Sequence, residues 1–238
     1  MTTLGIIGSG YIGAAVARLA VAAGIDVVIA NSRGPATLTA LVEELGPQAS
    51  AGTVEEAAQA GELVLLSIPF NAIPSMPPDV LAGKIVLDTS NYYPSRDGRI
   101  AELDTNALTT SEYVQRHFAA ARLVKAFNSI LAHHIPQLAR PSGAPDRSAL
   151  PVAGDDAEAK TRAAALLDQL GFDTVDAGSA ADSWRIEPES APYCRIYLQD
   201  PTTPSEEIEE APGAPVSADV LRQAIATTSR VNVAARPV

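Results

Sequence analysis

Short runs of apolar residues recur along the first half of the chain and are separated by longer amphipathic stretches. The apolar runs are Leu4–Gly8, Asp26–Ala30, Glu62–Ser67, Lys84–Asp88 and Arg122–Ala126. Continuous apolar strands separated by helices are typical of a parallel sheet that helices cover on both faces. Because crossovers between parallel strands are right-handed, we predict an α/β fold with a doubly wound, mostly parallel sheet.

The stretches between these runs carry helix signals. Tyr11–Ala23 is rich in Ala, Val and Leu, and it is followed by Gly24, where a left-handed cap favours glycine. Pro35–Leu45 is expected to form a second helix. Thr53 and Glu56 have the capping-box spacing that starts a short third helix.

After a Pro/Gly-rich loop the chain adds one more strand–helix–strand unit, predicted at Leu150–Ala153, Asp156–Leu170 and Thr174–Asp176. We assign this unit, with everything before it, to one domain over residues 1–178. Residues 179–238 are expected to form a small helical or irregular part, with an exposed acidic loop at Pro204–Pro215 and a helix at Ser217–Ser229.

Composition narrows the class of protein. The chain has 238 residues, a formal net charge of -11 and one cysteine, Cys194. The negative charge argues against a general nucleic-acid binder, because neutralising phosphates needs clustered Lys and Arg. A single cysteine excludes an intrachain disulfide, and no Cys/His zinc spacing occurs, so no metal site is predicted. With no signal peptide or membrane span in the sequence, we expect a cytoplasmic protein without a membrane partner.

The segment between the first strand and the first helix reads Gly8-Ser9-Gly10-Tyr11-Ile12-Gly13, the pattern G-x-G-x-x-G. In this setting the first glycine permits a tight turn, the second lets the backbone approach a pyrophosphate, and the third allows close helix–strand packing. The pyrophosphate would accept hydrogen bonds from the N–H groups at the helix start, where the helix dipole favours anions. We therefore predict a Rossmann dinucleotide site that includes Gly8, Ser9, Gly10, Tyr11 and Ile12.

The end of the second strand decides between the two nicotinamide cofactors. NAD enzymes usually place Asp or Glu there, about 20 residues past the glycines, to hold the ribose hydroxyls. This chain has Asn31, Ser32 and Arg33 instead. An acid would repel a 2′-phosphate, whereas arginine attracts one and can stack on adenine, so NADP(H) is predicted.

Ligands of such sheets bind outside the carboxyl ends of the strands. The residues there that we expect to line the pyrophosphate, the ribose or the reacting ring are Ser67, Ile68, Pro69, Phe70, Asn91 and Asn128. Capping of the helices that follow is the alternative role for Asn91 and Asn128.

Several stretches, namely GIIGSGYIG, NSR, SIPF and PVAGDDAEAK with the later GFDTVDAG, resemble the coenzyme F420-dependent NADP reductase family. The resemblance covers roughly residues 4 to 178. It implies a Rossmann domain with a small C-terminal part and hydride transfer between NADPH and the deazaflavin F420. Related ferric-reductase domains use the same nucleotide fold with flavin.

The resemblance also assigns roles by position. It places Gly8, Ser9, Gly10 and Ile12 at the pyrophosphate, Ser32 and Arg33 at the 2′-phosphate, Pro69 and Phe70 beside the nicotinamide, and Ala126–Ser129 where members approach the deazaflavin.

Hydride transfer between two stacked rings needs orientation and exclusion of water more than acid–base catalysis. Reduction of a ketone or an imine would also need a proton donor. The candidate donors are Lys125, His133, His134 and Tyr193, each of which could instead be a packing or surface residue. Of two adjacent helical histidines, at most one is expected to face the site. The catalytic set predicted from the sequence is Lys125, Asn128 and His134.

The leading function is therefore an NADP(H)-dependent oxidoreductase that passes hydride to a planar small-molecule acceptor such as F420 or flavin. Two alternatives stay open: a carbonyl or imine reductase, and an NADPH-binding module without catalysis. The segment Ala180–Val238 is expected to cover the nicotinamide pocket or to form the surface of a homodimer.

Overall fold

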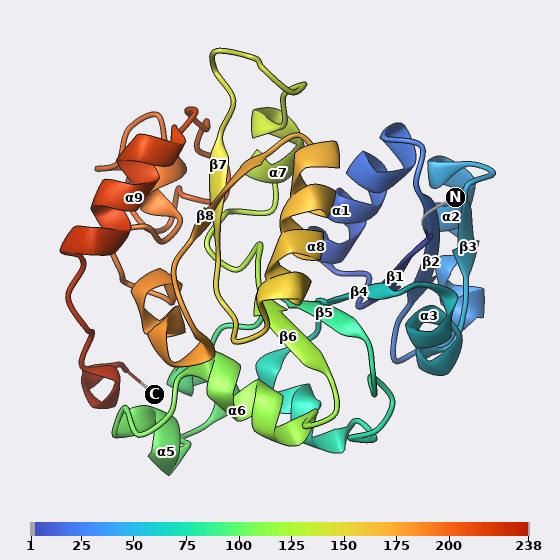
Figure 1. Ribbon diagram of the computed structural model, residues 1–238, viewed down its shortest axis with the longest axis horizontal. Helices are drawn as coiled ribbons and strands as arrows, with labels where there is room; N and C mark the ends of the chain where they lie inside the picture. Colours follow the sequence, from blue (N-terminus) through green and yellow to red (C-terminus); the bar gives the residue numbers. More distant parts are fainter. Residues whose placement is uncertain (1–2, 238) are drawn as a thin grey trace.

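The computed structural model describes residues 3–237 and has a central sheet with helices on both sides (Figure 1). Its strands are β1 (Thr3–Ile7), β2 (Asp26–Ala30), β3 (Ala49–Ala51), β4 (Leu63–Leu66), β5 (Ile85–Asp88), β6 (Arg122–Lys125), β7 (Ala149–Val152) and β8 (Asp173–Asp176). Its α-helices are α1 (Tyr11–Ala22), α2 (Thr39–Leu45), α3 (Val54–Ala60), α4 (Pro94–Asp97), α5 (Ala101–Asp104), α6 (Thr110–His117), α7 (His134–Leu138), α8 (Ala157–Gln169) and α9 (Ala218–Thr227). Short 3-10 helices cover Pro35–Leu38, Phe70–Ser75, Ala180–Ile186, Arg195–Tyr197 and Val233–Ala235.

Six strands form one parallel sheet in the order β3-β2-β1-β4-β5-β6. The order reverses between β1 and β4, so a crevice for a ligand is expected at the carboxyl ends of these two strands. The doubly wound α/β fold is confirmed, and each of the five apolar runs is a strand within one residue at either end. Strand β3 was not predicted, because the short sequence Ala-Ser-Ala carries no apolar run.

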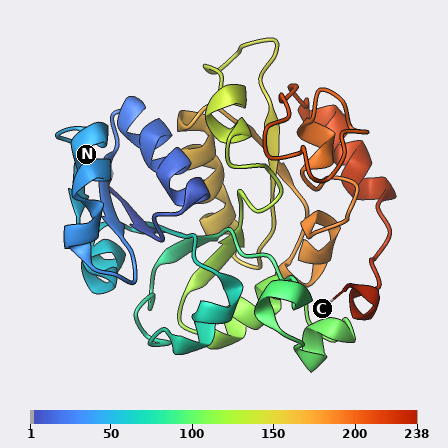
Figure 2. The ribbon, with the colours of Figure 1, turned by 180° about the vertical axis from the view of Figure 1, so that it is seen from behind.

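Two hydrophobic clusters lie on opposite faces of the large sheet. Leu65 of β4 belongs to the cluster that α1, α2, α7 and α8 cover, while its neighbours Val64 and Leu66 belong to the cluster under α3 and α6. Successive side chains of a strand point to opposite faces, so burial on both sides requires an uninterrupted apolar sequence. Figure 2 shows the same layers from behind.

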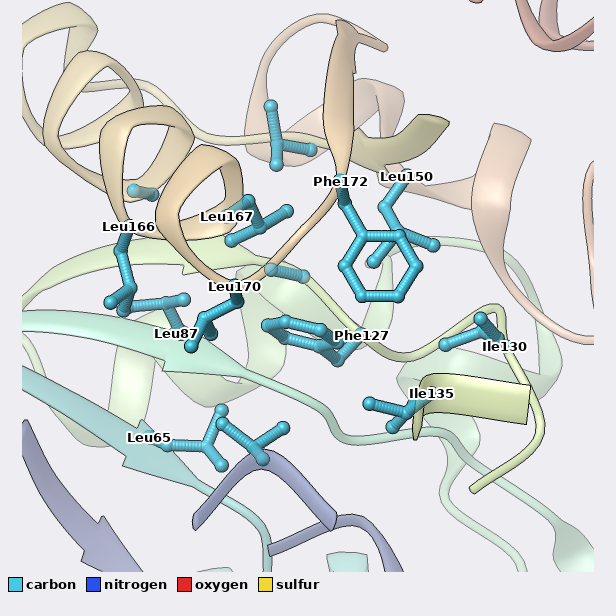
Figure 3. Packing of buried hydrophobic residues seen from close by; sticks show 14 of the residues in the cluster. Leu65, Leu87, Phe127, Ile130, Ile135, Leu150, Leu166, Leu167, Leu170 and Phe172 are labelled. Atoms are coloured by element: carbon cyan, nitrogen blue, oxygen red, sulfur yellow. The ribbon is translucent and has the colours of Figure 1, made fainter. Parts of the chain in front are cut away.

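Strands β7 and β8 form a separate two-stranded parallel sheet. Between residues 3 and 237, an isolated antiparallel bridge from Lys125 to Ala153 is the pairing that joins it to the end of β6. The predicted strand–helix–strand unit is confirmed, but it adds a second sheet rather than further strands to the first. Figure 3 shows the junction, where the rings of Phe127 and Phe172 pack edge to face with centroids 6.2 Å apart.

The C-terminal segment packs on this second sheet, and α9 lies beside β7 and β8 (Figure 1). Tyr197, Leu221 and Ile225 belong to the same hydrophobic cluster as the residues of α8. The predicted C-terminal helix is present as α9, and Ser217 caps it by accepting a hydrogen bond from the N–H of Val220. One core thus spans both sides of residue 178, and a division into two domains stays a prediction.

Helix boundaries in the first part of the chain agree with the sequence at some positions and differ at one. The capping box of Thr53 and Glu56 is confirmed, and Gly24 follows α1 with a φ of +77°. The prediction of a single helix over Pro35–Leu45 is wrong, because Leu38 has φ -103° and ψ 0°, which separates a 3-10 turn from α2. In the described part of the chain, each helix is too short or too polar to cross a bilayer.

Candidate functional site

The loop between β1 and α1 places its three glycines in different surroundings. A Cβ on Gly8, which has a φ of +112°, would lie 1.9 Å from the carbonyl oxygen of Ser67. A Cβ on Gly13 would lie 1.9 Å from the carbonyl oxygen of Gly8. A Cβ on Gly10 would meet no heavy atom within 4 Å. The first two glycines therefore allow close packing inside the protein, whereas Gly10 leaves room for a ligand to approach the backbone.

The helix that follows begins with free N–H groups. Its N-cap, Gly10, provides no side-chain hydrogen bond, and its first turn contains no acidic residue. Tyr11, the first residue of α1, is 89% exposed. Backbone donors and the positive end of the helix dipole therefore face the space beside the loop, where a phosphate would be stabilised.

A cavity of about 450 Å³ opens on one side of this loop. Nine of the predicted cofactor-binding residues line this cavity, namely Gly8, Ser9, Gly10, Asn31, Ser32, Arg33, Ser67, Ile68 and Pro69. Glu55 and Met76 also reach it. The structure thus gathers the predicted pyrophosphate loop and the predicted 2′-phosphate residues around one space, which we call the nucleotide cavity.

Asn31 organises the turn at the end of β2. Its Nδ2 donates hydrogen bonds to the hydroxyls of Ser9 (3.2 Å) and Thr37 (3.0 Å), and its Oδ1 accepts one from the N–H of Arg33 (2.9 Å). The side chain of Arg33 is exposed and forms neither an ion pair nor a hydrogen bond with residues 3–237. Asn31 therefore holds the loop, while the guanidinium of Arg33 remains available to an anion in the nucleotide cavity.

A second cavity, of about 460 Å³, lies on the other side of the glycine loop. It shares Gly10, Ser67, Ile68 and Pro69 with the nucleotide cavity, so the two spaces meet at the loop. The rest of its wall consists of Tyr11, Ile12, Thr89, Ser90, Asn91, Tyr93, Arg96, Asn128, Ile130, Leu131, Ala132, Tyr193, Cys194 and Glu209. We call it the acceptor cavity.

Two asparagine amides connect the ends of β5 and β6 in this cavity. Nδ2 of Asn91 donates to the carbonyl oxygen of Asn128 (2.8 Å), and Nδ2 of Asn128 donates to Oδ1 of Asn91 (3.2 Å) and to the carbonyl oxygen of Ile186 (2.7 Å). The helices that follow are capped at Tyr93 and His133, so the alternative role of these amides as helix caps is wrong.

The C-terminal segment contributes Tyr193, Cys194 and Glu209 to the acceptor cavity. Cys194 has a φ of +39° and sits in a γ-turn in which the N–H of Arg195 lies 2.5 Å from the carbonyl oxygen of Tyr193. The N–H of Cys194 donates to the carbonyl oxygen of Ser129 (2.8 Å), which fastens this turn to the end of β6. Burial raises the pKa of the Cys194 thiol to about 12, so it stays neutral at ordinary pH.

Phe70 departs from its predicted place. Its side chain is buried and packs between Tyr92 and Tyr113, with ring centroids 5.8 and 5.3 Å away, and it lines neither cavity. Phe70 begins a 3-10 helix whose apolar side turns into the core, so we revise its role to packing.

Lys125 also departs from its predicted place. It is completely buried, and its Nζ donates to Oδ2 of Asp88 (2.9 Å) and to the carbonyl oxygen of Ser90 (2.7 Å). Oδ1 of Asp88 in turn accepts a hydrogen bond from the N–H of Ser90 (3.0 Å). Lys125 therefore lies behind the turn that carries Asn91 and does not line the acceptor cavity. We revise its role from proton donor to a residue that holds this turn in place.

The two histidines form a pair and line neither cavity. His134 is buried, and its pKa is lowered, chiefly by that burial. The Nε2 atoms of His133 and His134 both lie within hydrogen-bonding distance of the carbonyl oxygen of Ala211, at 2.8 and 2.9 Å. Neither histidine lines a cavity, in keeping with the expectation that at most one of them faces the site, and a catalytic role for His134 has no geometric basis.

Sequence reasoning missed Tyr93 and Arg96 as parts of the site. Arg96 lies over the ring of Tyr93 at 5.0 Å and donates to the carbonyl oxygen of Asn91 (2.7 Å). Both follow the carboxyl end of β5 closely, Tyr93 as the N-cap of α4 and Arg96 within that helix, so their position was a usable signal. Glu209 is brought to the cavity by a tail without regular structure, and no sequence pattern could place it. Among residues 3–237, no group of three or more His, Cys, Asp or Glu side chains could hold a metal ion.

Residues 3–92 match the profile of a protein family described as NADP oxidoreductase coenzyme F420-dependent. The matched region contains the glycine loop, the Arg33 turn and the carboxyl ends of β4 and β5.

Solved structures with the same fold include a hypothetical protein, SMa0349, from Sinorhizobium meliloti, which is 35% identical with a TM-score of 0.66 over 77% of this chain and 88% of that one. A protein from Arthrobacter sp. FB24, described as a candidate F420-dependent NADP reductase, is 27% identical with a TM-score of 0.63 over 77% of this chain and 87% of that one.

A relative of greater length is Metalloreductase STEAP3 from Rattus norvegicus, which is 32% identical over 187 residues. The match covers 77% of this chain and 35% of the rat protein, so the chain spans about a third of that relative.

Proposed function

This chain belongs to the family of coenzyme F420-dependent NADP oxidoreductases, and we propose that it transfers hydride between NADPH and a planar acceptor such as F420 or flavin. The observation that carries the proposal is the meeting of two cavities across the glycine loop. A dinucleotide that places its pyrophosphate on this loop would lie with its adenosine half in the nucleotide cavity. Its nicotinamide half would extend into the acceptor cavity.

The nucleotide cavity favours NADPH over NADH. Its one cationic side chain among the described lining residues is Arg33, which is free of internal partners and is therefore available to a 2′-phosphate. Ser32 beside it offers a hydroxyl donor. Glu55 is the acidic residue of the same lining and would repel a phosphate. The preference for NADPH over NADH therefore depends on the positive charge of Arg33.

The acceptor cavity argues for turnover rather than for binding alone. The nicotinamide half of a bound NADPH would occupy part of this cavity, which is as large as the nucleotide cavity, and an acceptor ring would share the remaining space with it. Three elements far apart in sequence form its wall, namely the ends of β5 and β6 and the turn at Tyr193. With cofactor and acceptor bound, such a wall would help to exclude water from the transferring hydride and to hold the two rings in register.

Binding is tested by calorimetric titration of the protein with NADPH and with NADH. We expect NADPH to bind at least tenfold more tightly, which corresponds to about 1.4 kcal/mol. Equal affinities would remove the basis for the cofactor assignment. A homodimer stays a separate expectation, which analytical ultracentrifugation would check.

A further inference from the structure

Tyr193 lies at the centre of the polar wall of the acceptor cavity. Its hydroxyl oxygen accepts a hydrogen bond from Nδ2 of Asn91 (3.2 Å). A second, short hydrogen bond joins it to the hydroxyl of Tyr93. All three residues line the acceptor cavity, and each comes from a segment next to the carboxyl end of a strand or from the C-terminal segment.

The hydrogen atoms of this group exceed its acceptors. The amide of Asn91 donates one hydrogen to the carbonyl oxygen of Asn128 and the other to Tyr193. The two phenols carry one hydrogen each, and the bond between them uses one of the two. Within residues 3–237, the remaining phenolic hydrogen meets no oxygen or nitrogen acceptor, and the neighbouring thiol of Cys194 is a weak one. That hydrogen is therefore available to a ligand in the cavity.

Tyr193 is the phenol of the pair whose oxygen would keep more hydrogen bonds after losing its proton. If Tyr193 lost its proton, its oxygen would still accept hydrogen bonds from Asn91 and from Tyr93. Tyr93 without its proton would keep the single bond from Tyr193. A phenolate that receives two hydrogen bonds is stabilised more than one that receives one.

On this geometry, and resting on the proposed function, we propose that Tyr193 donates a proton to a nitrogen or oxygen atom of the acceptor as the hydride arrives from NADPH. The C–H bond at the nicotinamide C4 breaks and its electron pair forms the new bond to the acceptor. The O–H bond of Tyr193 breaks and its proton joins the acceptor heteroatom. NADP⁺ and the reduced acceptor leave, and the phenolate takes a proton from water.

The proposal defines a substrate class. The acceptor carries a nitrogen or oxygen conjugated to the atom that receives the hydride, as a flavin, a deazaflavin, a ketone or an imine does. Burial raises the pKa of Tyr193 well above its ordinary value, and burial also raises that of Tyr93, so both phenols enter the reaction protonated. Arg96, over the ring of Tyr93, adds positive charge beside the pair.

The test compares Tyr193→Phe and Tyr93→Phe with the control Tyr113→Phe, whose ring packs on Phe70 outside the acceptor cavity. Oxidised F420, FMN, cyclohexanone and a cyclic imine serve as probes with NADPH, in H₂O and in D₂O. We expect Tyr193→Phe to lower kcat by about 10²- to 10⁴-fold and to abolish the solvent isotope effect, since general acids contribute on that scale. Tyr93→Phe should fall between Tyr193→Phe and the control, and NADPH affinity should stay within twofold in all three.

Two failures are distinguishable. If the wild-type protein reduces a probe and Tyr193→Phe keeps its kcat and solvent isotope effect, the role of Tyr193 is overturned and the proposed function stands. If the wild-type protein binds NADPH but reduces none of the probes, the proposed function is overturned and the role of Tyr193 with it. Circular dichroism melting curves verify that each variant is folded.

Discussion

The variant Gly10→Ala tests whether the glycine loop binds a ligand or serves packing alone. Gly10 has φ -72° and ψ -170°, which any residue adopts, and an added methyl group would meet no heavy atom within 4 Å. The loss of a glycine N-cap and the lower entropy of the unfolded chain oppose each other, so the free energy of unfolding should change by less than about 1 kcal/mol. The protein should fold normally.

The same methyl group would occupy the space through which the backbone approaches the pyrophosphate. Lengthened hydrogen bonds from the N–H groups of the loop to a charged phosphate should cost about 1.5–3 kcal/mol, or roughly 10- to 100-fold in the Kd for NADPH. The assay is calorimetric titration with NADPH beside a thermal melt of the same sample. Gly8→Ala is the contrast: its methyl group would lie 1.9 Å from the carbonyl oxygen of Ser67, so it should lower the Tm as well.

The reasoning would be refuted by a Gly10→Ala protein that melts like the wild type and binds NADPH with an unchanged Kd. That result would mean that the pyrophosphate does not approach this loop.

Three further predictions concern other parts of the site. Arg33→Ala should weaken NADPH binding about tenfold and leave NADH binding unchanged, because it removes one charge-assisted contact to the 2′-phosphate; parallel titrations check it, and an equal loss for both cofactors would contradict it. Lys125→Met leaves the buried carboxylate of Asp88 unpaired and should lower the free energy of unfolding by about 3–5 kcal/mol. The double variant with Asp88→Leu should recover most of that loss. A loss under about 1 kcal/mol for Lys125→Met in denaturant unfolding would contradict a buried ion pair between Lys125 and Asp88. The pKa of Cys194 is raised from 9.0 to about 12 in the folded protein, so its contribution to stability is complete below pH 9 and is lost as the pH rises toward 12. Between pH 8 and 11 the free energy of unfolding of the wild-type protein should therefore fall more steeply than that of Cys194→Ala, by at most about 1.4 kcal/mol per pH unit. Equal slopes for the two proteins would contradict the raised pKa of Cys194.

Most of the large sheet could be predicted because a strand that is buried on both faces requires an uninterrupted run of apolar residues. The run ELVLLS around β4 has no polar interruption, since Leu65 faces one core and Val64 the other. The short strand β3 carries no such run and was missed. Whether β7 and β8 join the large sheet depends on pairing between distant segments, which local sequence does not encode.

Two parts of the nucleotide cavity, the glycine loop and the Arg33 turn, could be predicted because they belong to one local motif. The glycine loop and the Arg33 turn lie within one strand–helix–strand unit whose geometry follows from the fold. Lys125 and His134 failed as candidates for a different reason. Their chemistry suited a proton donor, but burial beside Asp88 and beneath Ala211 is decided by tertiary packing.

The acceptor cavity shows the limit most clearly. Tyr193 was a candidate from its chemistry alone, and its partner Tyr93 lies 100 residues earlier in the chain. The tail that carries Tyr193 has little regular structure, so its course over the sheet is set by the γ-turn at Cys194 and the bond to Ser129.

The most direct measurement of the proposed reaction follows the absorbance of oxidised F420, and separately of FMN, after mixing with the protein and either NADPH or NADH. We predict bleaching of at least one of these acceptors with NADPH and little or none with NADH. Bound NADPH with no bleaching of either acceptor would contradict hydride transfer to a planar ring at this site.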